Sequence, residues 1–268
     1  MINGLICYDE ERYERNKYFA SSLRAELEQL GINAEICMLD KVKDYTNIKF
    51  VIMRTYSKEI SKELEEKNIR VFNNSLISSI CNDKYNTYQF FKSIGLDFLP
   101  FVLIEKNNFK QQNINFPVVI KSRFGHGGKE VFMANNYEDI ETIFNNLKED
   151  SLIAQKVADT LGKDLRVYVL GGKIFKSVMR VSDTDFRSNF SLGGKAYLHE
   201  LTNKEKNLVD EVIKNLNIDL VGIDIMYDND KPILNEIEDI VGTRMLYSLG
   251  INAASVYSEY INKIITIK

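Results

Sequence analysis

The stretch LVGIDIMYDNDKPILNEIEDI, residues 220–240, decides the fold because it combines a hairpin pattern with three regularly spaced acids. LVGIDIMY is rich in β-branched and apolar residues, DNDKP has turn chemistry, and ILNEIED resumes the apolar alternation, which together predict two antiparallel strands. A turn centred on Asp230 puts Asp224 opposite Glu236. Because strand side chains alternate between faces, Glu238 shares the face of Glu236. The hairpin therefore predicts three carboxylates on one patch.

Such a patch needs something to offset its charge. Two unit charges about 4 Å apart repel by roughly 4 kcal/mol at an effective dielectric near 20, so the cluster requires a counter-charge or water. A divalent metal is one candidate, and magnesium prefers a few carboxylate oxygens together with substrate phosphates and waters. For an isolated hairpin the favoured alternative is an exposed sheet face whose acids are simply solvated.

The composition predicts an ordinary soluble globular protein, with 44% hydrophobic and 27% charged residues among 268. The net charge of -3 offers no electrostatic footprint for nucleic acid or an anionic membrane. No apolar run approaches the roughly 20 residues of a membrane span, and the first residues do not read as a signal peptide. Cys7, Cys37 and Cys81 lack CxxC spacing, so we expect buried thiols in a reducing cytoplasm and no disulfide framework or zinc site.

Changes in pattern divide the chain into three parts. Residues 1–81 alternate strands with helices, which predicts a small parallel α/β domain, and they lack a GxGxxG dinucleotide motif. Residues 82–157 start with a helix capped by Asn82 and ended by Gly95, and continue as an α+β lobe. Residues 158–268 are mainly hairpins followed by closing helices, and they contain the acidic hairpin.

A glycine-rich loop, KSRFGHGGK at residues 121–129, joins two strands of the middle part. It is not a Walker A loop, because no glycine stands five positions before Gly128 and Glu130 occupies the place of the metal-binding Ser or Thr. A glycine-rich hairpin tip can fold its backbone N–H groups over phosphates, with Lys121 at its base adding positive charge. For the loop taken alone, a flexible turn is the favoured interpretation.

Lys84 and Lys121 would each be an ordinary surface lysine in isolation. Together with the glycine flap and the carboxylates, they are the parts needed to position and neutralise a triphosphate with magnesium. Arg187, in a polar loop, could hold a transferring phosphoryl group, and its alternative is a surface ion pair. We expect His126 to be solvent-exposed at the loop tip and His199 to be structural.

Five runs of sequence follow one another in a recognisable order: NDK, VVIKSRFGHGGKEV, IAQKVADTLGKDLRVYVLGGK, DFRSNFSLGG and LVGIDIMYDNDKPILNEIE. This order resembles the ATP-grasp superfamily. Within it the chain is most similar to the RimK-like branch, which includes ribosomal-protein glutamate ligases and lysine-biosynthesis ligases. The resemblance implies an ATP-grasp fold of mixed α/β and α+β class, in which an amino-terminal parallel α/β domain (1–81) precedes two lobes (82–157 and 158–268).

The resemblance also implies roles for individual residues. The positions that match the nucleotide site are Lys84, Lys121, Gly125, Gly127, Gly128, Gln155, Lys156, Val157 and Asp164. The metal ligands match Asp224, Glu236 and Glu238, and the polar positions around the phosphates and the acyl intermediate match Arg166, Arg187 and Asn189. Two positions depart from the pattern of the branch, which usually has an asparagine at Glu238 and an acidic residue at Lys156.

The implied activity is that of an ATP-dependent carboxylate–amine ligase that forms an acyl phosphate and releases ADP and phosphate. The implied cofactors are ATP and Mg²⁺, with Mn²⁺ as a substitute. The implied substrates are a small-molecule or peptide carboxylate and an amine, in the cytoplasm, with no nucleic acid or membrane as partner. A homo-oligomer is in keeping with enzymes of this kind. Two alternatives stay open, an ATP-binding regulatory protein without ligase activity and a phosphotransferase.

Overall fold

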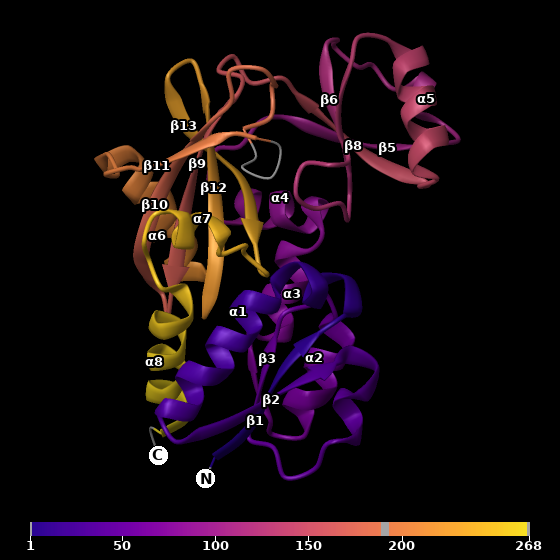
Figure 1. The fold of residues 1–268 in the computed structure, drawn as a ribbon. Helices are drawn as coiled ribbons and strands as arrows, with labels where there is room; N and C mark the ends of the chain where they lie inside the picture. Colours follow the sequence, from indigo (N-terminus) through magenta and orange to yellow (C-terminus); the bar gives the residue numbers. More distant parts are fainter. Residues whose placement is uncertain (1, 189–192, 267–268) are drawn as a thin grey trace.

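The computed structural model describes residues 2–188 and 193–266 of the chain. Within these residues it contains three β-sheets with helices packed around them (Figure 1). One sheet lies in each of the ranges 1–81, 82–157 and 158–268, while the boundaries between domains stay a prediction. No helix in the described ranges is long and apolar enough to cross a membrane.

The amino-terminal sheet is parallel and has the strand order β2-β1-β3-β4, as the alternation of strands and helices predicts. Its elements are β1 (Ile2–Tyr8), α1 (Glu10–Gln29), β2 (Ile32–Met38), the 3-10 helix η1 (Leu39–Asp44), β3 (Phe50–Met53), α2 (Lys58–Glu66), β4 (Arg70–Phe72) and α3 (Ser75–Cys81). Both faces of β1 are buried, because Leu5 and Cys7 pack in one cluster and Ile6 and Tyr8 in another. Helices on both faces explain why the central strands β1 and β3 are largely apolar.

The cysteines are buried free thiols, as expected from their spacing. Cys7 and Cys37 face each other in the register of β1 and β2, although they are distant in the sequence. A hydrogen bond to Cys37, together with burial, raises the pKa of the Cys7 thiol far above its usual value. The Cys7 thiol is therefore inert under ordinary conditions, whereas the hydrogen bond from Cys7 lowers the pKa of the buried Cys37 thiol.

The middle sheet is antiparallel, with the order β5-β8-β6-β7. Its elements are α4 (Lys84–Ser93), β5 (Phe101–Glu105), η2 (Phe109–Gln111), β6 (Val118–Ser122), β7 (Val131–Ala134), α5 (Tyr137–Leu147) and β8 (Ser151–Lys156). The helix before this sheet begins one residue later than predicted: Asp83, not Asn82, is the N-cap and accepts from the Tyr85 N–H. Asn82 instead ends α3. Gly95 follows the helix with φ +70°, as expected for a terminating glycine.

The third sheet is antiparallel and has the order β11-β10-β9-β12-β13. Its elements are β9 (Lys163–Leu170), β10 (Lys173–Val181), β11 (Lys195–Leu198), α6 (Asn203–Asn215), β12 (Leu220–Asp228), β13 (Lys231–Glu238), α7 (Arg244–Ser248) and α8 (Ala253–Thr266). Thr202 and Glu205 form the capping box at the start of α6. The acidic hairpin is β12 and β13, at one edge of this sheet.

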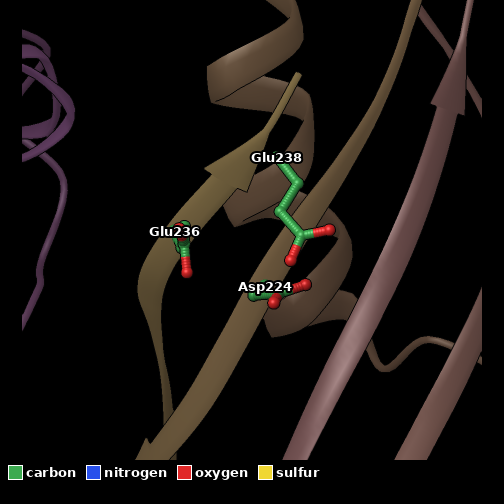
Figure 2. Close-up of side chains that lie close together, drawn as sticks. All are labelled: Asp224, Glu236 and Glu238. Atoms are coloured by element: carbon green, nitrogen blue, oxygen red, sulfur yellow. The ribbon is translucent and has the colours of Figure 1, made fainter. Parts of the chain in front are cut away.

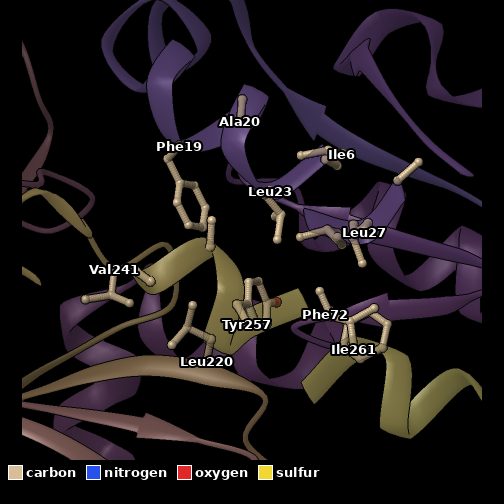
Figure 3. Packing of buried hydrophobic residues seen from close by; sticks show 14 of the residues in the cluster. Ile6, Phe19, Ala20, Leu23, Leu27, Phe72, Leu220, Val241, Tyr257 and Ile261 are labelled. Carbon is tan, nitrogen blue, oxygen red and sulfur yellow. The ribbon is translucent and has the colours of Figure 1, made fainter. Parts of the chain in front are cut away.

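The carboxy-terminal helix returns to the amino-terminal domain, where α8 lies beside α1 (Figure 3). Tyr257 and Ile261 of α8 share one buried cluster with Leu23 and Leu27 of α1. Burial of apolar surface drives this contact. The first and last segments of the described chain are thereby packed together, which fixes the amino-terminal sheet beside the third sheet.

A buried asparagine strengthens the same junction. Asn73, just after β4, donates to the Leu220 carbonyl and to Asp239 Oδ1, both at 2.7 Å. Its own oxygen accepts from the backbone N–H groups of Asp219 and Leu220, both at 3.0 Å. Asp239 also accepts from Asn82 at 3.1 Å. Because one amide satisfies groups at both ends of the acidic hairpin, the hairpin is held in a fixed position against the amino-terminal domain.

Candidate active site

Asp224 pairs with Glu236 in the acidic hairpin, as predicted, but the position of the turn differs from the prediction. Its turn consists of Asn229 and Asp230, both with positive φ (52° and 58°), which is the two-residue geometry favoured in hairpins. The turn is thus centred between these residues and not on Asp230. A β-bulge at Asn235 then shifts the register, so that Asp224 still pairs with Glu236. Without that extra residue, Asp224 would face Asn235.

The three predicted carboxylates come together at this edge. Asp224, Glu236 and Glu238 each offer an oxygen, and these oxygens lie within 4.8 Å of one another. Figure 2 shows them on neighbouring positions of β12 and β13. Asp224 is 3% exposed, and the other two are half-buried. The solvated-face alternative is therefore wrong for Asp224.

Two arginines supply the counter-charge that such a cluster needs. Arg166 donates to both oxygens of Asp224, at 2.8 and 2.7 Å, and lies 2.6 Å from Glu238. Arg180 lies 2.7 Å from Asp224 and donates to both oxygens of Asp164 at 2.5 Å. Burial raises the pKa of Asp224, but the two guanidinium groups outweigh this, so that its pKa lies below the usual value.

Strand alternation and one glycine make this arrangement fit. Asp164 and Arg166 share one face of β9, while Leu165 and Val167 point into the core on the other. On β12, Gly222 lies against the Arg166 side chain, and a Cβ there would just touch Arg166 Cδ at 3.4 Å. The same Cβ would lie only 2.6 Å from a Val241 methyl group, so a larger residue would displace its neighbours.

The carboxylates still repel one another in spite of the arginines. Shielding from solvent, followed by the neighbouring Asp224 and Glu236, raises the pKa of Glu238. Three carboxylate oxygens at one point form the hard-oxygen donor set that Mg²⁺ takes, with the remaining positions filled by water or phosphate. The residues therefore fit a magnesium ion, which would relieve this repulsion.

Both predicted lysines are buried and not on the surface. Lys84, the first residue of α4, donates to the Gly125 carbonyl and lies 3.4 Å from Glu236. Lys121, on β6, donates to Asn235 at 3.0 Å. Removal from solvent lowers the pKa of Lys121 to about 8. Two ammonium groups therefore lie beside the carboxylates, at the base of the glycine loop.

The loop between β6 and β7 is folded over this site as a flap. Gly127 and Gly128 both have positive φ (70° and 76°), which glycine adopts without strain. A Cβ at Gly125 would lie 2.1 Å from Glu130 Oε2, so this position also requires glycine. Arg187 forms an ion pair with Asp185 at 2.7 Å, as its alternative interpretation expects, and also donates to the Gly128 carbonyl at 2.9 Å. The flap is thus held down from the opposite lobe.

The tip of the flap contacts the amino-terminal domain, which corrects the expectation that His126 is solvent-exposed. His126 is half-buried and stacks on Tyr56, with ring centroids 3.9 Å apart and planes 22° apart. The guanidinium of Arg12 lies 3.8 Å from the centre of the same Tyr56 ring. Burial, followed by the charge of Lys84, lowers the pKa of His126 to about 4. The imidazole is therefore neutral at pH 7 and packs as an aromatic ring.

Gln155 and Lys156 end β8, where the chain passes from the middle lobe to the third sheet, and we call this connection the hinge. Gln155 is buried and donates to the Leu99 carbonyl at 3.3 Å. Lys156 is half-exposed and pairs with Asp228 at 2.8 Å. Lys156, which stands where the RimK-like branch usually has an acidic residue, thus has a partner on the acidic hairpin.

These residues surround a cavity of about 90 Å³ between the middle and third sheets. The predicted residues that line it are Lys84, Lys121, Gly125, Gly127, Gly128, Gln155, Lys156, Asp164, Arg187, Asp224, Glu236 and Glu238. Arg166 instead lines a second cavity, of about 600 Å³, on the amino-terminal side of the flap. Val157 is half-buried and is not among the lining residues within the described ranges. Asn189 lies outside the described residues.

Sequence reasoning missed Arg180 and Asn235 as members of the site. Arg180 stands between apolar residues in the run VMRV, and a charge in such a place is a signal that could have identified it. Asn235 enters only because of the bulge, for which the sequence carries no distinct signal. His199, in contrast, lies 3.0 Å from Glu205 in the capping box of α6 and is not among the residues that line either cavity.

Comparison with known proteins places this site in a family. The model of the RimK-like ATP-grasp domain matches residues 81–261. The uncharacterized protein MG011 of Mycoplasma genitalium is 30% identical over 255 residues, with 92% of this chain and 87% of that protein covered. A probable alpha-L-glutamate ligase of Legionella pneumophila is 26% identical over 218 residues, with 78% of this chain and 72% of that protein covered.

Solved structures agree on the fold. The D-alanine–D-alanine ligase from Bacillus anthracis, in complex with ATP, superimposes with a TM-score of 0.74 at 16% identity, over 98% of this chain and 99% of that one. The predicted mixed architecture with a parallel amino-terminal sheet is therefore confirmed. The chain belongs to the RimK-like ATP-grasp family and is an ATP-grasp ligase that forms carbon–nitrogen bonds.

Proposed function

We propose that the protein joins a carboxylate to an amine through an acyl phosphate, with ATP bound under the glycine flap. The observation that carries this proposal is the meeting of two buried lysines, a glycine flap and three carboxylates in one cavity. Lys84 and Lys121 would offset phosphate charge, and the N–H groups of the flap would donate to phosphate oxygens. Gln155 and Lys156 would lie beside the adenine at the hinge, and Asp164 near the ribose.

The flap has to open before a nucleotide can bind. The cavity holds about 90 Å³, whereas pockets for ligands of this size measure roughly 300–1,000 Å³. Opening would break the hydrogen bonds from Arg187 and Lys84 to the carbonyls of the flap and the stacking of His126 on Tyr56. Phosphates would replace those carbonyls as partners of the two cations, so that nucleotide binding compensates for the opened contacts.

Asp224, Glu236 and Glu238 would hold Mg²⁺, which supplies neutralisation of the phosphate charge when bound. The protein's side chains and backbone would position ATP, the acid and the amine for reaction. A carboxylate oxygen of the acid attacks the γ-phosphorus while the bond to the bridging oxygen of ADP breaks. The amine nitrogen then attacks the acyl carbon, its proton is lost, and phosphate leaves. Arg187 would stabilise the transferring phosphoryl group, and the closed flap would keep water from the acyl phosphate.

Arg166 would act as a positioning residue for the same chemistry. Its two hydrogen bonds to Asp224 fix the orientation of that carboxylate, and buried partners of this kind set the geometry of metal ligands. Asn189 is proposed as a further polar contact to the intermediate, by its match to the family pattern alone. A homo-oligomer and a cytoplasmic location also remain predictions.

The affinity for ATP should fall at alkaline pH. The pKa of Lys121 in the free protein is about 8, and bound phosphate favours the charged lysine and so raises this pKa. Affinity is therefore constant below pH 8 and declines by about tenfold per pH unit above it. Calorimetric titration of the whole protein with ATP between pH 7 and 9.5 measures the effect. The Lys121→Arg variant, whose charge persists, should give a flat profile, and an equal decline in that variant would contradict the assignment.

A screen for ADP release tests the proposed function. The protein is mixed with MgATP and pairs of acids and amines, with glutamate first among the amines because a relative is named as a probable alpha-L-glutamate ligase. ADP release that requires both substrates, with a product equal in mass to acid plus amine less water, is the expected result. A product that gains phosphate would instead indicate the phosphotransferase, and ATP binding without turnover for any pair would indicate the regulatory protein.

A further inference from the structure

The second cavity has a strong excess of positive charge. It holds about 600 Å³ and is lined by seven arginines and lysines against three carboxylates. It adjoins the first cavity, since Gly125, Glu130 and Glu238 are among the residues that line both. A molecule in this cavity therefore lies next to the acidic hairpin and beneath the flap.

Most of these cations already have acidic partners. The pairs are Arg12 with Asp9, Arg15 with Glu11, Arg166 with Asp224 and Glu238, and Arg180 with Asp164 and Asp224. Lys129 and Arg244 are exposed, and water can solvate their charges. Arg54 is the exception, because it is both buried and without such a partner.

Arg54 is 3% exposed, and within the described ranges no carboxylate forms an ion pair with it. One nitrogen donates to the Val241 carbonyl at 2.9 Å, and the Nε lacks a hydrogen-bond partner. The Tyr8 hydroxyl, at the end of the adjacent strand, faces this guanidinium: burial raises the pKa of the hydroxyl, and the Arg54 charge opposes that rise. A phenol is a neutral partner, so it does not offset the charge of Arg54. Asp239 is influenced by the charge of Arg54, but among the described residues its hydrogen bonds come from Asn73 and Asn82 and it forms no ion pair with Arg54. A buried charge is strongly disfavoured unless an anion offsets it.

The fold places this guanidinium where a ligand can reach it. Arg54 directly follows β3, at the carboxyl edge of the parallel sheet, which is the edge where open α/β sheets bind ligands. Arg54 is also among the residues that line the second cavity. A guanidinium presents planar donors that match the oxygens of a carboxylate or phosphate.

We propose that Arg54 is a specificity residue that binds an anionic group of the substrate, a carboxylate or a phosphate separate from the group that reacts. The inference rests on the proposed function for the identity of that reaction. The substrate would lie in the second cavity with its reacting end toward the acidic hairpin and its anionic group against the amino-terminal domain. Substrates without such a group would leave Arg54 buried and unpaired, so the cavity selects against them.

Ligand binding without turnover tests this proposal, so that failure of the ligase reaction leaves the test intact. The unfolding midpoint of the whole protein is titrated with glutarate, with its neutral diamide glutaramide, and with inorganic phosphate, at ionic strength matched with chloride. We expect at least one anion to bind, and glutaramide not to. Arg54→Met should bind that anion about 10²-fold more weakly, and Arg54→Lys should bind it with intermediate affinity. Preference for glutarate identifies a carboxylate, and preference for phosphate identifies a phosphate ester.

Arg70→Met is the matched control in the same domain. Arg70 is paired with the buried Asp219 at 2.5 Å, so its removal should lower the unfolding midpoint without anion, whereas Arg54→Met should not. The proposal is overturned if Arg54→Met binds the anions as tightly as the wild type, or if the wild type prefers none of them to glutaramide. A loss of stability in Arg54→Met equal to that in Arg70→Met would also overturn it, since Arg54 would then serve the fold.

Discussion

The Glu236→Gln variant should lose Mg²⁺-dependent ADP formation by about 10²–10³-fold while remaining as stable as the wild type. Glu236 is half-buried, and its ion pair is a 3.4 Å contact with Lys84. Removing its charge also relieves repulsion from Glu238, so the fold should lose little. The proposed metal site, however, would lose one of its three carboxylates. Steady-state ADP release over a magnesium titration and the thermal unfolding midpoint measure the two effects.

The control for this variant is Glu211→Gln. Glu211 also pairs with a lysine, Lys214, but it lies on α6 and is not among the residues that line either cavity. It should retain wild-type turnover and magnesium dependence. Undiminished turnover in Glu236→Gln would rule out this carboxylate as a metal ligand, and equal losses in both variants would show that the effect is not specific to the site.

Asp224→Ala should instead destabilise the protein, by about 3–5 kcal/mol. Asp224 is 3% exposed and accepts three hydrogen bonds from Arg166 and Arg180. Without it, two buried guanidinium groups lose a shared partner. Unfolding in urea, followed by both circular dichroism and tyrosine fluorescence, measures the free energy of unfolding.

A double-mutant cycle separates the charge effect from lost packing. The combined variant Asp224→Ala with Arg166→Met removes the acid together with one of the cations that it neutralises. It should therefore be less destabilised than the sum of the two single variants. A loss below about 1 kcal/mol in Asp224→Ala, or strict additivity in the cycle, would be incompatible with a charge network that supports the fold.

The contrast between these two acids shows what sequence spacing can and cannot predict. Alternation of side chains predicts that Asp224, Glu236 and Glu238 share a face, and the structure confirms this. It does not predict that Asp224 is buried and bound by two arginines, while Glu236 is half-buried with a single, longer contact to Lys84. That difference arises because β9 pairs with β12 in the third sheet, and pairing between distant strands leaves no local trace in the sequence.

Two smaller differences between prediction and structure concern the N-cap of α4 and the position of the hairpin turn. Asn82 and Asp83 are both good N-cap residues, and the sequence of α4 alone does not distinguish them. The preceding helix α3 decides the choice by ending on Asn82. The sequence predicts a turn centred half a residue too late, because it gives no sign of the β-bulge at Asn235. A bulge adds one residue to a strand without changing its apolar alternation in a recognisable way.

Expectations based on isolated residues were least successful. Lys84 and Lys121 would be surface lysines on composition alone, yet both are buried. His126 would be exposed at a loop tip, yet Tyr56 of another domain covers it. In each case the deciding neighbour is distant in sequence, so only the order of motifs along the whole chain could indicate the site.

The stacking of His126 on Tyr56 also provides a direct optical reporter of the flap. The chain contains no tryptophan, so Tyr56→Trp would introduce a single indole whose emission can be followed without background. In the closed state this ring would lie between the imidazole and the Arg12 guanidinium, and opening of the flap would leave one of its faces in water. A shift of the emission to longer wavelength would then report opening in real time, and stopped-flow mixing with nucleotide could show whether flap motion limits the rate of each catalytic cycle.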